Sequence, residues 1–149
     1  ISEERPVIVA GERSEAIFEM ARQNVARAQL EDTVAVRHTP FEELEPPPGT
    51  GTLIINPPYG ERMDHRGAEA EAEVEAIQAL YKMIGDTLKK RWSGWQAWVI
   101  TSNLEAAKHI KLTPKPRIQL FNGALDCRFM KHDLYEGSRR LTPRPSPTA

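Results

Sequence analysis

The residues best suited to chemistry are Asn56-Pro57-Pro58-Tyr59, which directly follow the apolar run Thr52–Ile55. The run has no polar alternation and ends in strand breakers, which predicts a buried strand. Proline lacks the N–H group that a central strand needs, so the chain must leave the sheet at Asn56. Ligands of open α/β sheets bind at the carboxyl ends of strands. We therefore expect a rigid loop with an amide and a phenol at an active-site edge.

Such a loop could activate an exocyclic amine of a nucleobase, whose lone pair is conjugated into the ring. The Asn56 side-chain oxygen and a proline carbonyl could accept the amine hydrogens and draw the nitrogen toward a pyramidal geometry. Tyr59 would offer a flat face to a flipped base. Asn56, Pro57, Pro58 and Tyr59 are thus the expected catalytic residues. The alternative is a strand followed by a proline-rich turn in which Tyr59 is only a packing anchor.

The motif Asn56–Tyr59 resembles that of S-adenosylmethionine (SAM)-dependent methyltransferases that act on exocyclic amines of adenine or guanine. The longer string Ile55–Met63 is similar to bacterial 23S ribosomal RNA guanine-N2 methyltransferases, members of which often carry a THUMP domain. A second string, Asn122–Cys127, resembles a segment near the end of the same catalytic domain. The likeness runs from about Val7 to Leu134.

The resemblance implies a Rossmann-like class I SAM-dependent methyltransferase fold, with a mostly parallel sheet and a C-terminal antiparallel hairpin. We expect residues 1–136 to form a partial catalytic domain. Residues 137–149 are expected to be a disordered tail, because Gly, Arg, Ser, Thr and Pro dominate there. The implied activity is methyl transfer from SAM to the N2 amine of a guanine in large-subunit ribosomal RNA. The alternatives are an adenine-N6 DNA methyltransferase and a non-catalytic RNA-binding or assembly module with this fold.

Glu12 is the expected ligand of the cofactor ribose. It ends the apolar run Val7–Gly11, and Ser14 can cap the helix that follows. Nucleotide-binding folds often place a carboxylate after a strand, because it can accept hydrogen bonds from ribose hydroxyls. The resemblance implies that Glu12 does so for SAM, and the alternative is a surface glutamate before a helix. The complete set of expected cofactor-binding residues is Glu12, Arg13, Thr39, Pro40 and Asn56.

The sequence departs from the family pattern at two places in the cofactor site. Relatives usually carry an aspartate where this sequence has Thr39, near the cofactor's adenine, so Phe41 or backbone groups could serve instead. No Gly-x-Gly turn precedes Glu12, although the class needs a Gly-rich turn beside the methionine moiety. We therefore expect that the sequence begins at the second strand of the fold and that these residues alone are inactive.

The charges are unevenly distributed along the sequence. Residues 1–74 hold 7 Lys and Arg against 15 Asp and Glu, a net of −8, and residues 75–149 hold 13 against 6, a net of +7. An RNA-binding surface would therefore lie on the second half. The alternative is that these cations are ordinary solvated helix ends and loops. The basic residues concerned are Lys89, Lys90, Arg91, Lys108, Lys111, Lys115, Arg117, Arg139 and Arg140.

Composition narrows the class of protein. The sequence has one cysteine, Cys127, and four scattered histidines, so we expect no internal disulfide and no metal site. A single cysteine fits a reducing cytoplasm, and we expect Cys127 to be a small buried hydrophobe. No stretch reaches the roughly 18–20 apolar residues of a membrane span. The expected location is cytoplasmic, and the oligomeric state is left open.

The remaining elements are predicted from periodicity and breakers. We expect a helix with its apolar face at Ile77–Leu88, a buried strand at Trp95–Thr101, a short helix capped by Ser102 or Asn103, and a hairpin turning at Asn122-Gly123. Asp126 could touch substrate. The polar segment Asp64–Gly67 could form a lid. The three tryptophans, Trp92, Trp95 and Trp98, could stack on bases, but packing is the favoured interpretation.

Overall fold

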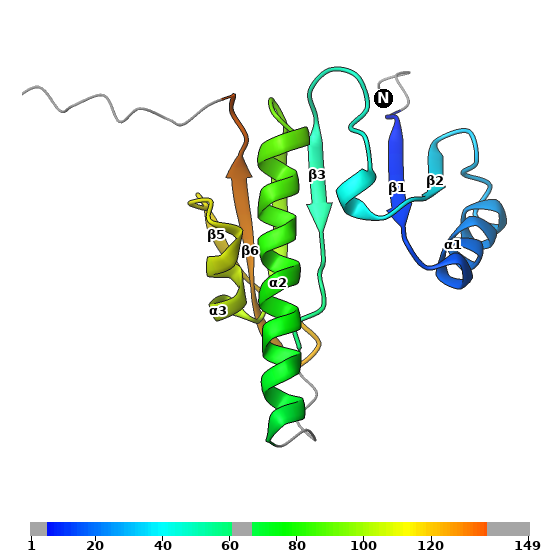
Figure 1. Ribbon diagram of the computed structural model, residues 1–149. Coiled ribbons are helices and arrows are strands. Elements are labelled where there is room, and N and C mark those ends of the chain that lie inside the picture. The colour runs from blue at the N-terminus through cyan, green and yellow to red at the C-terminus, as the bar shows by residue number, and fades with distance from the viewer. Residues whose placement is uncertain (1–5, 61–66, 137–149) are drawn as a thin grey trace, which may run out of the picture.

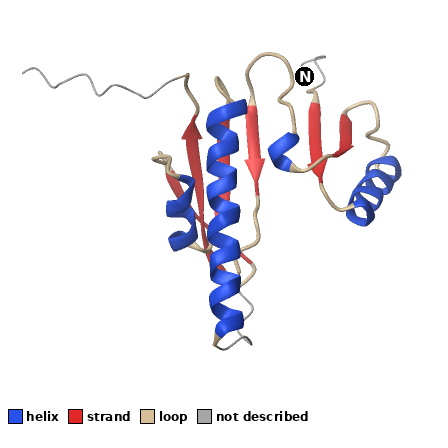
Figure 2. Cartoon of the chain, in the orientation of Figure 1, coloured by secondary structure: helices blue, strands red, loops and turns tan. Residues whose placement is uncertain are grey.

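The computed structural model describes residues 6–60 and 67–136 (Figure 1). Helices and strands alternate in the first two thirds, and a strand pair closes the described part (Figure 2). The strands are β1 (Ile8–Glu12), β2 (Val34–His38), β3 (Thr52–Ile55), β4 (Gln96–Thr101), β5 (Arg117–Asn122) and β6 (Leu125–Asp133). The helices are α1 (Glu15–Arg27), α2 (Ala68–Arg91) and α3 (Leu104–Ala107), with 3-10 turns η1 (Phe41–Glu43) and η2 (Lys108–Ile110).

The strands form two hydrogen-bonded groups. β1 pairs in parallel with β2, and the other four follow the order β3-β4-β6-β5. The β3–β4 pair is parallel, whereas β6 runs antiparallel to both β4 and β5. The expected α/β architecture with a C-terminal antiparallel hairpin is confirmed. β1 and β3 run in the same direction in Figure 1, so their carboxyl ends lie toward the same edge.

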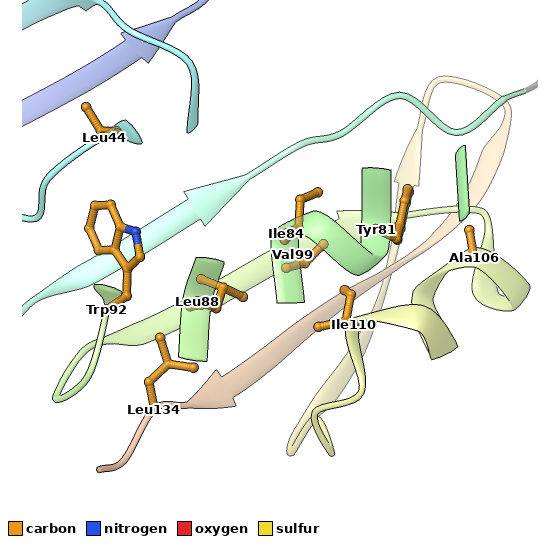
Figure 3. Packing of buried hydrophobic residues seen from close by; sticks show 10 residues of the cluster. Leu44, Tyr81, Ile84, Leu88, Trp92, Val99, Ala106, Ile110 and Leu134 are labelled. Atoms are coloured by element: carbon orange, nitrogen blue, oxygen red, sulfur yellow. The ribbon is translucent and has the colours of Figure 1, made fainter. Parts of the chain in front are cut away.

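The core lies between α2 and the four-stranded group. α2 is amphipathic and buries Tyr81, Ile84 and Leu88 against Val99 of β4 and Leu134 after β6 (Figure 3). Each fully buried side chain of this size contributes about 1.5–3 kcal/mol of transfer free energy. This burial fixes the long helix across β4.

Gly85 lets α2 approach the chain after α3 closely. A Cβ atom at this position would lie 2.1 Å from the backbone oxygen of Ile110. Ile110 is itself fully buried. Alanine would favour the helix by about 1 kcal/mol over glycine, so the glycine here serves the helix contact and not helix formation.

The first strand pair joins the core through the segment after β2. Leu44 is buried, and its side chain lies against Gly11 of β1, where an added Cβ would be 2.9 Å from Leu44 Cδ2. The half-buried Phe41 stacks on Trp92 with ring centroids 6.1 Å apart. Figure 3 shows Leu44 and Trp92 at the same end of the core. These contacts attach β1 and β2 to the body of the fold.

Most elements predicted from the sequence are confirmed, with two local corrections. The run Thr52–Ile55 forms a strand, but the strand is not buried as expected, because β3 lies at the edge of the four-stranded group and Ile54 is 67% exposed. Ser14 occupies the N-cap position of α1, but its side chain makes no capping hydrogen bond. The Glu12 carboxylate instead accepts the backbone N–H of Ser14 at 2.7 Å, a bond that links the end of β1 to the start of α1. Trp92 is buried and packs edge-on against Trp95, as expected of core residues. The proposed lid residues 64–66 and the tail 137–149 lie outside the described residues.

Candidate active site

The loop after β3 is held at both ends. Pro57 is buried, whereas Asn56 and Pro58 are exposed and Tyr59 is half-buried. Gly60 follows with φ of 77°, a left-handed conformation that glycine adopts at no steric cost. The strand thus ends where the prolines predict, and the loop presents the Asn56 amide to solvent at the carboxyl end of β3.

The side chains of Asn56 and Tyr59 are directly connected. The Tyr59 hydroxyl donates a 2.7 Å hydrogen bond to Asn56 Oδ1. The Asn122 amide, 63 positions further along the chain, donates to the same hydroxyl at 3.5 Å. The fold therefore brings the two motifs noted in the sequence to one place, because β5 ends beside the loop after β3.

The predicted ribose ligand lies at the carboxyl ends of β1 and β2. Glu12 pairs in register with His38, and the Thr39 N–H donates to the Glu12 carbonyl at 2.9 Å. His38 Nε2 lies 3.1 Å from the carbonyl oxygen of Arg13. Pro40 follows in extended conformation at the start of η1. Four of the predicted cofactor-binding residues are thus adjacent, and the fifth, Asn56, is on the loop after β3.

Glu12 already carries one local hydrogen bond. Its Oε1 atom accepts the Ser14 N–H, and its side chain is half-buried. This contact orients the carboxylate at the end of β1, where a carboxylate can accept from ribose hydroxyls. Phe41, considered for the adenine, packs one ring face against Trp92.

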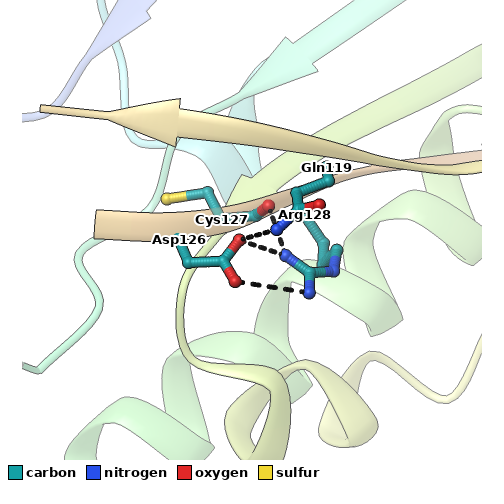
Figure 4. Close-up of polar contacts among 4 residues, drawn as sticks. All are labelled: Gln119, Asp126, Cys127 and Arg128. Carbon is teal, nitrogen blue, oxygen red and sulfur yellow. Dashed lines mark hydrogen bonds and ion pairs between the residues drawn. The ribbon is translucent and has the colours of Figure 1, made fainter. Parts of the chain in front are cut away.

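The Asp126 side chain is hydrogen-bonded to other residues of its own hairpin, β5 and β6. Arg128 pairs with both of its carboxylate oxygens, and Gln119 Nε2 donates to Oδ1 at 3.0 Å (Figure 4). The hydrogen bonds from Arg128 and Gln119 hold the pKa of the Asp126 carboxyl below its usual value. The neighbouring Cys127 is fully buried, as predicted. This arrangement gives Asp126 a role in fixing the hairpin of β5 and β6.

Several of the basic residues considered for RNA contact have acidic partners nearby. Arg91 pairs with Glu45, and Lys108 pairs with Glu105 at 2.7 Å. Lys89 lies 3.9 Å from Asp86. The described cations before and within β5, Lys111, Lys115 and Arg117, are exposed, and Arg139 and Arg140 lie outside the described residues.

Residues 6–60 and 67–136 contain neither a cluster of metal ligands nor a membrane-spanning helix. These residues contain no group of three His, Cys, Asp or Glu side chains placed to hold a metal ion. In the same residues, no helix has the length and apolar character needed to cross a bilayer.

A family model describing an RMKL-like methyltransferase domain matches residues 2–131. The chain belongs to this family. Members named ribosomal RNA large subunit methyltransferase K/L match at 35% identity in Syntrophotalea carbinolica and at 34% in Shewanella sp. strain MR-4. The matches cover 88% and 83% of this chain but only 18% and 16% of those relatives. The sequence thus corresponds to a small part of much longer proteins.

Solved structures show the same fold at lower identity. The methyltransferase candidate SMU.472, complexed with S-adenosylhomocysteine (SAH), superposes with a TM-score of 0.73 at 23% identity, over 88% of this chain and 32% of that one. The N-terminal domain of human METTL16 with SAH has a TM-score of 0.56 at 18% identity, over 87% and 52%. The SAM-dependent methyltransferase fold expected from the sequence is confirmed.

The Asn103 side chain is a polar group beside the loop that was not among the site residues predicted from the sequence. Asn103 was predicted only as a helix cap, yet its side-chain amide also donates to the backbone carbonyl of Tyr59 at 2.8 Å. A usable signal was present, because Asn103 closely follows the carboxyl end of β4, the strand beside β3. Polar residues that follow neighbouring parallel strands gather at one edge.

Proposed function

We propose that this chain carries the catalytic loop of a SAM-dependent methyltransferase that methylates the N2 amine of a guanine in large-subunit ribosomal RNA. The observation that carries the proposal is the Asn56–Tyr59 loop at the carboxyl end of β3, with its amide exposed and hydrogen-bonded to Tyr59. The names of the relatives support ribosomal RNA as the substrate class. The guanine-N2 position rests on the resemblance of residues 55–63 and 122–127.

The loop would act by orienting the amine. An amide oxygen has two lone pairs, and the Tyr59 hydroxyl uses one of those on Asn56 Oδ1. The second can accept one amine hydrogen, and the Pro57 carbonyl can accept the other. Both bonds favour a pyramidal nitrogen whose lone pair points away from the base plane. The Tyr59 ring would stack on the base, since aromatic stacking holds flipped bases.

SAM, when bound, would supply a methyl group on a positively charged sulfur. The amine lone pair would form the new N–C bond while the C–S electrons return to sulfur, and the amine would then lose a proton to water. Glu12 would hold the ribose, with Arg13, Thr39 and Pro40 beside it. The contribution of the chain is thus positioning and polarisation, which require no covalent intermediate.

The test uses the full-length protein and large-subunit RNA that lacks the modification. After incubation with SAM, nuclease digestion and mass spectrometry should show N2-methylguanosine. N6-methyladenosine, or methylation of DNA in preference to RNA, would overturn the assignment in favour of the adenine enzyme.

The catalytic loop is tested by Asn56→Ala. Methyl transfer should fall below detection while the Kd of SAM, measured by calorimetry, stays within about threefold, because Glu12, Arg13, Thr39 and Pro40 would still hold the cofactor after the Asn56 amide is lost. Wild-type activity in this variant would exclude the proposed role of the motif. Failure of the wild-type protein to bind SAM would exclude the cofactor.

A further inference from the structure

A buried pair of hydroxyls links helix α2 to the carboxyl end of β4. The Tyr81 hydroxyl and Thr101 Oγ1 are 2.6 Å apart, and both residues are fully buried. Burial raises the pKa of the Tyr81 phenol above its ordinary value. Thr101 Oγ1 also accepts the backbone N–H of Asn103 at 3.0 Å. The pair therefore fixes the backbone where β4 ends.

The side chain of Asn103 extends this link to the catalytic loop. Its Oδ1 accepts the Ala106 N–H at 2.9 Å, and its Nδ2 donates to the Tyr59 carbonyl at 2.8 Å. The two partners define the orientation of the amide, because a backbone N–H can only donate and a carbonyl can only accept. One half of the amide caps α3, and the other half holds the residue that orients Asn56.

We propose that Asn103 is a positioning residue for methyl transfer, which holds the Asn56–Tyr59 loop through the Tyr59 carbonyl. The proposal rests on the function proposed above, in which Asn56 accepts an amine hydrogen and Tyr59 stacks on the base. The buried Pro57 fixes the start of the loop, and Asn103 fixes its end. The next residue, Gly60, turns the backbone with a positive φ, which glycine adopts readily because it has no Cβ. Small errors in such placement cost rate even when binding is unchanged.

The two functions of the Asn103 amide can be separated by substitution. Serine and aspartate are good N-cap residues, so Asn103→Ser and Asn103→Asp keep the hydrogen bond to Ala106. Serine is too short to reach the Tyr59 carbonyl, and aspartate opposes that carbonyl with a second acceptor. Asn103→Ala removes both the cap and the bridge.

The experiment measures kcat, the Kd of SAM and the melting temperature of the full-length protein. We expect kcat to fall at least about tenfold in all three variants, with the Kd of SAM within about twofold of wild type. The melting temperature should fall clearly only in Asn103→Ala. Wild-type kcat in the Ser and Asp variants, or a kcat that falls only together with the melting temperature, would overturn the positioning role.

The Asn56→Ala variant distinguishes failure of this proposal from failure of the proposed function. If Asn56→Ala is inactive while Asn103→Ser and Asn103→Asp are fully active, the loop is catalytic but Asn103 does not position it. If Asn56→Ala retains activity, the function assigned to the loop fails, and the positioning role fails with it.

Discussion

The Tyr59 hydroxyl donates a 2.7 Å hydrogen bond to Asn56 Oδ1. The two residues frame the buried Pro57, so the loop is closed by its own side chains and not only by proline stiffness. The hydroxyl orients the amide and leaves one lone pair of Oδ1 for a substrate hydrogen. The aromatic ring and the amide of the motif thus form a single unit.

Tyr59→Phe tests this unit. The ring remains able to stack, but Asn56 loses its hydrogen-bond donor, so kcat should fall about five- to tenfold, equivalent to about 1 kcal/mol. The KM for RNA should change little. A variant with higher kcat would instead mean that the hydroxyl competes with the substrate for Oδ1. Single-turnover kinetics with saturating SAM separates the two results.

Glu12→Gln tests the proposed contact of Glu12 with the cofactor ribose. The amide oxygen can still accept the Ser14 N–H, but the charge and one acceptor are lost. Because hydrogen bonds to a charged group contribute about 1.5–3 kcal/mol, the Kd of SAM should rise about 10- to 100-fold. Glu15→Gln, at an exposed position in the first turn of α1, is the matched control and should bind normally. If the Glu12→Gln and Glu15→Gln variants bind SAM with the same Kd, Glu12 does not contact the cofactor.

His132 makes stability depend on pH. It is 2% exposed, and neither ring nitrogen has a hydrogen-bond partner in the described part of the chain. Burial, assisted by the positive charge of Arg117, lowers the pKa of His132 to about 4. The unfolded chain therefore binds more protons below its ordinary pKa of about 6.5, and the folded state is most stable above that pH.

The free energy of unfolding should accordingly fall by about 2 kcal/mol between pH 7 and pH 5 because of this residue. Urea denaturation at the two pH values measures the change. His132→Leu, which keeps an apolar side chain in the core, should remove that part of the pH dependence. If the free energy of unfolding of His132→Leu falls as much between pH 7 and pH 5 as that of the wild type, His132 is not the source of the pH dependence.

Gly85→Ala should destabilise the protein although alanine favours helices. The new Cβ would meet the Ile110 carbonyl oxygen at 2.1 Å, and overpacking of this kind costs about 1–3 kcal/mol. Glu75→Ala, at an exposed position of α2, should stay within about 0.5 kcal/mol of wild type. A Gly85 variant as stable as the control would mean that α2 moves away from Ile110 at little cost.

The sequence alone determined strand β3, the residue at which it ends, and helix α2. The apolar run before Asn56, the prolines after it and the helical spacing of Ile84 and Leu88 are local patterns, and each corresponds to an observed strand, loop or helix. Local patterns suffice here because proline geometry and side-chain periodicity act within a few residues. The position of the Asn56–Tyr59 loop at a strand end could therefore be predicted.

Only the tertiary structure decided which polar groups meet. The contacts of Asn122 with the Tyr59 hydroxyl and of Asn103 with the Tyr59 carbonyl join residues 63 and 44 positions apart. Such contacts depend on β4 lying beside β3 and on β6 lying between β4 and β5. That order is set by the packing of the whole core, so no local pattern contains it. The burial of His132 and the bond from Ser14 to Glu12 were likewise visible only in the folded chain.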